Sequence, residues 1–178
     1  MKYAALLRGI NVGGKNMLPM KALAAIFEAT GCKNVETYIQ SGNVVFEASS
    51  ALAKRLPQRI SEAIAERYGY QVPVIVRSAA QLRASAAGNP FVRESIAPKE
   101  LHLYFLGEQP STAAVTGLDP DRSPPDEFVV IGQDIYVRAP NGVGRSKLTN
   151  VYFESKLKVI CTARNWATVL RLAAITNS

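Results

Sequence analysis

Strand-like and helix-like patterns of apolar residues alternate along the first half of the chain. A continuous apolar run opens the chain, and apolar residues then recur at helical spacing between Pro19 and Gly31. Two strand-like runs flank the turn Ser41–Asn43, which predicts a β-hairpin. Ser49 can cap a long helix, in which Pro57 predicts a kink or a late start. The predicted strands are Tyr3–Arg8, Asn34–Gln40, Val44–Ala48 and Val72–Arg77, and the predicted helices are Met20–Thr30, Ser50–Tyr68 and a short one from Ala79.

The second half of the chain follows the same order of elements, which indicates an internal duplication. With an offset of 90 residues, segment 127–138 aligns with segment 37–48, and glycine or aromatic residues match at three positions. The matched pairs are Gly42 with Gly132, Phe46 with Tyr136, and Tyr38 with Phe128. The predicted elements of this half are a strand at Leu101–Leu106, a short helix at Ser111–Gly117, a hairpin over residues 127–139, a helix at Thr149–Lys158, a strand at Val159–Cys161 and a last helix at Asn165–Ile175.

This order of elements predicts an α+β protein made of two ferredoxin-like halves, each with the order β-α-β-β-α-β. The first half is expected to span residues 1–88 and the second residues 99–178, with residues 89–98 as the linker between them. Halves of roughly 90 residues have a comfortable size for small domains.

Composition places the chain among ordinary globular proteins. Of its 178 residues, 48% are hydrophobic and 20% are charged, and no apolar run approaches the ~20 residues that a membrane-spanning helix needs. The apolar segment near the N-terminus is shorter than the ~7–15 residues of a secretion signal. We therefore expect a cytoplasmic protein without membrane attachment.

The net charge of +7 is unevenly distributed along the sequence. From Arg138 onward seven Lys or Arg residues stand against Glu154 alone, whereas residues 107–134 hold six acids and one arginine. This basic C-terminal region would attract an acidic partner, although a solvated helix surface has the same composition.

Few residues are available for metal or nucleophilic chemistry. Cys32 and Cys161 have no CxxC spacing and are expected to be small buried residues. His102 is the single histidine, which argues against zinc ligation or a two-histidine relay, and its place in a strand predicts a surface or hydrogen-bonded residue. No metal site and no cofactor motif are expected, and no catalytic triad or acid pair is recognisable.

Three motifs resemble a known bacterial family. The segments LLRGINVGGKN, YIQSGNVVF and RNWATVLRLA occur in the order found in the family called domain of unknown function 1697, and the resemblance extends from Ala5 to about Ala173. The resemblance implies a mixed α/β, ferredoxin-like architecture and implies no activity. Polar residues of these motifs are the first candidates for a shared site, and Ala167 stands where Asn is common in the third motif.

The opening loop holds the first group of candidate ligand-binding residues. Residues Gly9–Asn16 approach the phosphate-loop pattern G-x-x-x-x-G-K-[ST], but Asn16 replaces the hydroxyl and Pro19 predicts a helix start several residues later. Nucleotide hydrolysis is therefore not expected, whereas a backbone nest for a phosphate or carboxylate and a plain glycine turn both fit the sequence. The candidate residues here are Arg8, Asn11, Lys15 and Asn16.

Two further groups of polar residues could join this loop. In the hairpin turn, Gly42 and Asn43 fit turn chemistry alone, whereas Gln40 does not, so amides lining a groove remain an alternative to a simple turn. Near the C-terminus, a basic loop before a predicted helix could hold a phosphate, or it could be a solvated connection with Ser146 or Thr149 as the helix cap. The candidate residues are Gln40, Ser41 and Asn43 in the turn, Arg145, Ser146 and Lys147 in the basic loop, and Arg164 and Asn165 at the start of the last helix.

These groups predict a protein that binds a small phosphate- or carboxylate-bearing molecule in a groove between the halves, and the sequence does not decide whether it is an enzyme. One alternative is a module for single-stranded nucleic acid, for which Tyr104 and Tyr136 are candidate stacking residues. Another alternative is a partner-binding protein without a small ligand. The oligomeric state is not indicated.

Overall fold

The computed structural model describes residues 1–178 and shows a mixed α+β fold with two four-stranded antiparallel sheets. The chain divides into two compact units, one made of Met1–Arg83 with Leu172–Ser178 and the other of Ala84–Arg171. The divisions fall inside helices α3 (Ala79–Ala87) and α6 (Trp166–Asn177). None of the helices combines the length and the apolar character that crossing a membrane requires.

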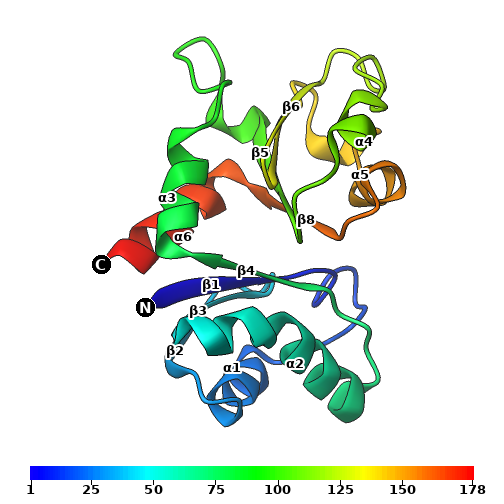
Figure 1. The fold of residues 1–178 in the computed structure, drawn as a ribbon. Helices are drawn as coiled ribbons and strands as arrows, with labels where there is room; N and C mark the ends of the chain where they lie inside the picture. Colours follow the sequence, from blue (N-terminus) through cyan, green and yellow to red (C-terminus); the bar gives the residue numbers. More distant parts are fainter. The chain divides into compact units, whose positions relative to one another are not determined.

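The sheet of the first unit has the strand order β2-β3-β1-β4, with every neighbouring pair antiparallel. Helices α1 (Met20–Ala29) and α2 (Ser50–Tyr68) lie on the same face of this sheet (Figure 1). Their apolar stripes, including Phe27 and Leu56, bury one face of the sheet, where Phe46 lies at the centre of an aromatic group. The strands are β1 (Lys2–Leu7), β2 (Lys33–Tyr38), β3 (Asn43–Glu47) and β4 (Val74–Ser78).

The second unit repeats this arrangement with the strand order β6-β7-β5-β8, again fully antiparallel. Helices α4 (Thr112–Thr116) and α5 (Asn150–Leu157) accompany this sheet, together with the 3₁₀ turns Pro98–Glu100 and Val143–Arg145. Phe153 of α5 is the centre of its aromatic core. The strands are β5 (Leu101–Leu106), β6 (Glu127–Ile131), β7 (Asp134–Arg138) and β8 (Cys161–Asn165).

The two units therefore share their order of elements and their strand order, which is consistent with two similar halves. Buried arginines add to the correspondence, since Arg77 and Arg164 are each the fourth residue of the last strand in their sheet. In both cases the next residue caps a helix, because Ser78 Oγ accepts from Gln81 N–H at 3.2 Å and Asn165 Oδ1 accepts from Thr168 N–H at 2.8 Å.

Most predicted elements are present with their ends shifted by one or two residues, and three differences are informative. Strand β8 lies C-terminal to the predicted Val159–Cys161, because buried polar residues, Thr162 among them, continue the strand beyond the apolar run. Strand β2 ends at Tyr38, so the hairpin turn comprises Ile39–Gly42 rather than Ser41–Asn43. The prediction of a late start for α2 is wrong. Ser49 caps the helix by accepting from Leu52 N–H at 3.2 Å, and Pro57 lies inside it.

Residues 89–98 belong to the second unit. Phe91 and Ile96 are buried, and the side chain of Asn89 accepts from Phe91 N–H at 2.9 Å. This segment is therefore held in place by its own buried apolar residues and does not serve only as a linker.

Candidate functional site

The opening loop connects β1 to α1 and turns sharply at its tip. Val12 and Lys15 form an isolated antiparallel bridge, and Lys15 N–H donates to the Val12 carbonyl at 3.0 Å. Gly13 and Gly14 have φ angles of 58° and 73°, so this is a type I′ turn that non-glycine residues adopt only with strain. All four residues of this tip are exposed.

The side chains of Asn11 and Asn16 stabilise the loop by hydrogen bonds to its own backbone. Asn11 Oδ1 accepts from Leu18 N–H at 2.7 Å, and Asn11 Nδ2 donates to the Leu18 carbonyl at 2.9 Å. Asn16 Nδ2 donates to the Gly9 carbonyl at 2.9 Å. The amides of Asn11 and Asn16, two of the predicted ligand contacts, thus bond to the loop itself.

The hairpin turn Ile39–Gly42 lies beside this loop. Asn11 Nδ2 also donates to the Gln40 carbonyl at 3.1 Å, which joins the two segments directly. Ile39 has a φ of 51°, an unusual backbone for a β-branched residue, and its side chain is half exposed. Asn43 is fully buried, and its Nδ2 donates to the Tyr38 carbonyl at 3.2 Å and to Ser41 Oγ at 3.0 Å. The structure therefore brings together the predicted residues of the loop and of the turn.

The loop and the turn carry positive charge and no negative charge. No Asp or Glu precedes Glu28, and none occurs in the turn. Lys15 and Gln40 are exposed, and no protein group binds either side chain. Arg8 is partly exposed, and its N–H donates to the Pro73 carbonyl at 3.0 Å. A ligand bound here could therefore contact the ammonium group of Lys15 and the side-chain amide of Gln40, which bind no other protein group.

A phosphate-loop arrangement is absent here. Helix α1 begins at Met20, four residues after Asn16, so the N-terminal N–H groups of the helix do not continue from the glycine-rich turn. No group of three or more His, Cys, Asp or Glu residues in the chain could hold a metal ion.

The predicted basic loop lies in the second unit, between β7 and α5. Arg145 and Lys147 are exposed, while Ser146 Oγ accepts from Leu148 N–H at 3.0 Å. Lys147 N–H donates to Ser123 Oγ at 3.0 Å, and Thr149 caps α5 by accepting from Tyr152 N–H at 3.1 Å. Backbone and hydroxyl groups thus fix the loop and leave its two basic side chains exposed to solvent.

Arg164 is buried rather than presented before the last helix. Its Nη1 donates to Thr162 Oγ1 at 2.9 Å and to the Ala163 carbonyl at 2.8 Å, and burial lowers the pKa of the guanidinium to about 10. Because side chains alternate along a strand, Arg164 and Leu103 face away from the core that contains Tyr104 and Ala163. The basic loop packs on that core through Leu148, so Arg164 and the basic loop belong to opposite faces of the sheet.

The stacking surface required by the nucleic-acid alternative is missing. Tyr104 and Tyr136 are each only 2% exposed. Their hydroxyls donate to the Leu148 carbonyl at 2.7 Å and to the Ser85 carbonyl at 2.9 Å. The prediction that these two tyrosines are available for bases is therefore wrong, because both are core residues of their unit.

Two polar residues of interest were not recognised from the sequence. Arg77 is buried in β4, and the repeat of an arginine one residue before a helix cap in both units was the signal that could have revealed it. His102 is partly buried in β5, its Nδ1 has no hydrogen-bond partner, and burial lowers its pKa. One of its two ring nitrogens thus lacks the hydrogen bond expected of a buried polar residue. By contrast Cys32 and Cys161 are buried and form no disulfide, as predicted.

Comparison with known proteins gives a family and a fold. The family model described as Protein of unknown function (DUF1697) matches residues 1–136. Among solved structures, the chain is similar to the conserved bacterial protein SP0830 from Streptococcus pneumoniae, with a TM-score of 0.73, 23% sequence identity and 98% of each chain covered. At this identity the similarity concerns the fold. No curated protein matches the chain.

Proposed function

Because the chain belongs to the family of proteins of unknown function DUF1697, its activity has to be inferred from its own residues, and we propose that it binds a small anionic ligand. The ligand carries a phosphate or carboxylate and binds to the opening loop Gly9–Asn16 and the turn Ile39–Gly42. The observation that carries this proposal is the exposed pair Lys15 and Gln40, on two segments that Asn11 joins and that contain no acid.

The length of the opening loop supports a role beyond connecting two elements. Twelve residues, Arg8–Pro19, separate β1 from α1, whereas five residues, Gly107–Ser111, make the corresponding connection between β5 and α4. The second unit therefore forms the same order of elements without a long loop after its first strand. A twelve-residue connection ordered by its own asparagines is the kind of segment on which binding residues are placed.

The charge of the first unit favours an anionic ligand. Its residues include eleven Lys or Arg and five Glu, a net charge of +6, so most of the +7 of the chain lies in this unit. A cationic surface raises the local concentration of anions and their association rate. At the tip of the loop, Lys15 and the exposed N–H groups of Gly13 and Gly14 would donate to an oxyanion, as in other backbone anion sites.

The second unit contributes a separate candidate contact. Arg145 and Lys147 are exposed on a fixed loop, and we keep them as proposed anion contacts of that unit. Asn165 caps α6, and Arg164 bonds within its own strand, so neither carries the proposal.

Thermal shift and calorimetry with inorganic phosphate, sugar phosphates, nucleotides, small carboxylates and a short oligonucleotide test this function. A ligand at 100 times its Kd adds ~2.7 kcal/mol, which raises the unfolding temperature by roughly 5–10 °C for a chain of this size. We expect a small anion to give such a shift, and Lys15→Ala and Gln40→Ala to reduce it.

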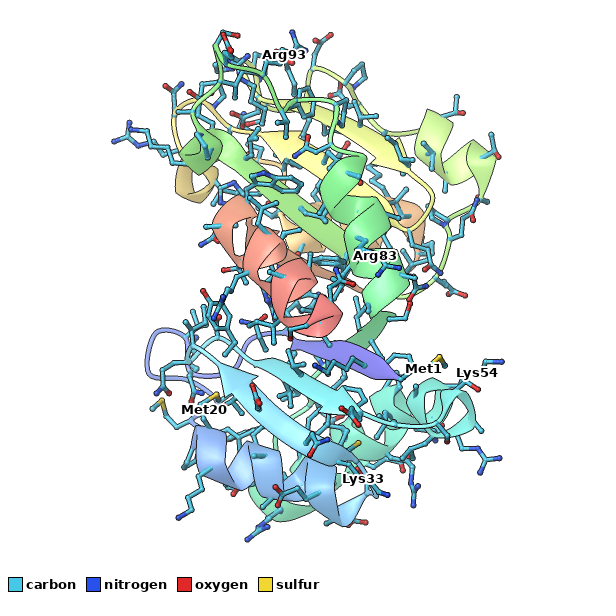
Figure 2. The ribbon with its side chains drawn as sticks, turned by 90° about the vertical axis from the view of Figure 1, so that its left-hand side faces the viewer. Met1, Met20, Lys33, Lys54, Arg83 and Arg93 are labelled. Atoms are coloured by element: carbon cyan, nitrogen blue, oxygen red, sulfur yellow. The ribbon has the colours of Figure 1, made fainter.

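Lys33→Ala is the matched control for Lys15→Ala. Both changes remove one exposed lysine of the first unit, and Figure 2 shows Met20 at the start of α1 and Lys33 beyond the other end of this helix. The proposal fails when no small anion stabilises the protein, or when Lys33→Ala reduces binding as much as Lys15→Ala. A shift with the oligonucleotide alone that disappears as salt rises would favour nucleic acid instead.

The finer description of the fold is also a proposal. The shared order of elements and the paired arginines Arg77 and Arg164 support two ferredoxin-like halves that arose by internal duplication. An alignment of many relatives tests this, because a duplication predicts that the two halves of an early-branching relative resemble each other more strongly.

We propose a cytoplasmic location because neither cysteine forms a disulfide. Cys32 and Cys161 are both buried and form no disulfide, which suits a reducing compartment. Fractionation of producing cells tests this location, and recovery of the protein outside the cytoplasm would contradict it.

A further inference from the structure

Strand β6 is an open edge of the second sheet. It is the terminal strand in the order β6-β7-β5-β8 and pairs with β7 alone. The hairpin between them has only two loop residues, Gly132 and Gln133, so Ile131 and Asp134 exchange their N–H and carbonyl groups. Hydrogen bonding then alternates along β6. The backbone groups of Phe128 and Val130 therefore point away from the sheet, and they have no partner in the chain.

Apart from Glu127 at its first position, strand β6 has no charged side chain that would protect this edge. Val129 and Ile131 are 36% and 50% exposed on the face of the strand opposite Phe128 and Val130, and the run from Phe128 to Ile131 contains no charge and no proline. Exposed apolar edge strands of this kind pair readily with another strand.

The corresponding edge of the first unit is protected. Strand β2 carries the exposed charges Lys33 and Glu36, and its register against β3 shifts between these two residues. Charges and irregular register are the usual means of preventing edge pairing. The contrast between two strands in the same topological position shows that the fold does not require β6 to be apolar and open.

We propose that β6 pairs antiparallel with β6 of a second copy of this chain. Pairing through the outward groups of Phe128 and Val130 places Phe128 of each copy opposite Val130 of the other. A two-fold axis then passes beside Val129, which faces its own counterpart, and the two four-stranded sheets join into one sheet of eight strands.

The charges of the strand are compatible with this register. Glu127 of each copy comes opposite Ile131 of the other, so no acid faces an acid. Arg138 also lies 3.3 Å from Glu127 within each copy, which offsets its charge. A strand of five residues buries less than the ~1,600 Å² of a standard interface, so the dimer is weak and depends on concentration.

Analytical ultracentrifugation of the purified chain from about 10 μM to about 1 mM tests the dimer, a range that covers weak association. We expect the mean mass to rise towards that of two chains. Val129→Lys should weaken dimerisation at least about tenfold, because it places two lysines opposite each other across the axis. Val151→Lys is the control, since Val151 is an exposed valine of the same unit.

A mixing experiment tests the register itself. Val129→Lys and Val129→Glu should each be monomeric alone, and an equimolar mixture should form a heterodimer, because position 129 faces only itself across the axis. The inference is overturned when the wild-type chain remains monomeric at the highest concentration, when Val129→Lys dimerises like the wild type, or when the mixture stays monomeric. None of these outcomes depends on the ligand proposed for the first unit.

Discussion

The side chain of Asn11 and the backbone of Leu18 form a closed pair of hydrogen bonds. Leu18 N–H donates to Asn11 Oδ1 at 2.7 Å, and Asn11 Nδ2 donates back to the Leu18 carbonyl at 2.9 Å. The side-chain amide of Asn11 thus pairs with the Leu18 backbone as a residue of a neighbouring strand would, and Leu18 is buried. This pair fixes the end of the opening loop to its beginning.

Asn11→Asp should destabilise the protein without changing the size of the side chain. The substitution removes both donations by Nδ2 and places an acceptor oxygen against the carbonyls of Leu18 and Gln40. We expect a loss of about 1–3 kcal/mol in the free energy of unfolding, measured by urea denaturation. Asn141→Asp is the control and should change the free energy of unfolding little, because Asn141 is exposed. Equal effects of the two substitutions would contradict the role of Asn11.

Gly42→Ala should destabilise the hairpin turn for two reasons. Gly42 has a φ of 80°, and an added Cβ would lie 3.0 Å from Leu7 Cβ and 3.0 Å from two side-chain carbons of Ile10. Strain and crowding together should cost about 1–3 kcal/mol. Gly144→Ala is the control, because its φ is ordinary and no atom lies within 4 Å of the added Cβ. A neutral Gly42→Ala would show that Ile10 and Leu7 can move aside.

Protonation of His102 should lower the free energy of unfolding in mild acid. Burial, opposed in part by a backbone hydrogen bond with Glu100, lowers the pKa of His102 below its ordinary value of 6.5. The unfolded chain therefore binds a proton at a higher pH than the folded chain. The stabilising contribution is complete above pH 6.5 and is lost as the pH falls below it towards the folded pKa.

Unfolding temperatures at pH 7.5 and pH 5.5 measure this effect. His102 is the single histidine, so His102→Gln should reduce the difference between the two temperatures. Carboxylates contribute equally to both proteins and cancel in the comparison. An unchanged difference in the variant would assign the acid sensitivity to other groups.

Phe153→Ala should remove the centre of the second unit's core. The ring of Phe153 lies 5.3 Å from Tyr104, 5.6 Å from Phe128 and 5.4 Å from Tyr152, measured between ring centroids. A cavity at a fully buried phenylalanine costs about 3–5 kcal/mol. Val151→Ala on the exposed side of the same helix should be nearly neutral. Denaturation curves that coincide for both variants would contradict this assignment of the core.

Much of the fold was predictable because its apolar residues follow simple periods. The two hairpins and α2 were predicted close to their observed positions, since alternation and helical spacing are strong there. A fixed repeat offset could not align the whole chain. The hairpin repeat has an offset of 90 residues, but β1 and β5 differ by 99 because the opening loop lengthens the first unit.

The candidate site was only partly predictable. Glycine and asparagine indicated the opening loop and the turn, but their spacing did not show that Asn11 and Asn16 bond inward rather than towards a ligand. The burial of Arg164 was not predictable for a related reason. A buried arginine in a short polar strand has the same sequence pattern as a cation before a helix, and tertiary burial distinguishes the two.

The first unit is discontinuous along the chain, and this affects the order of events during synthesis. Residues Leu172–Ser178 complete that unit, and Leu172 and Thr176 of this segment are buried. The first unit is therefore completed by residues synthesised after the whole interior unit Ala84–Arg171, so its stability depends on the C-terminal segment. A chain that stops at Arg171 should therefore be cleaved by protease in the first unit more readily than the full chain.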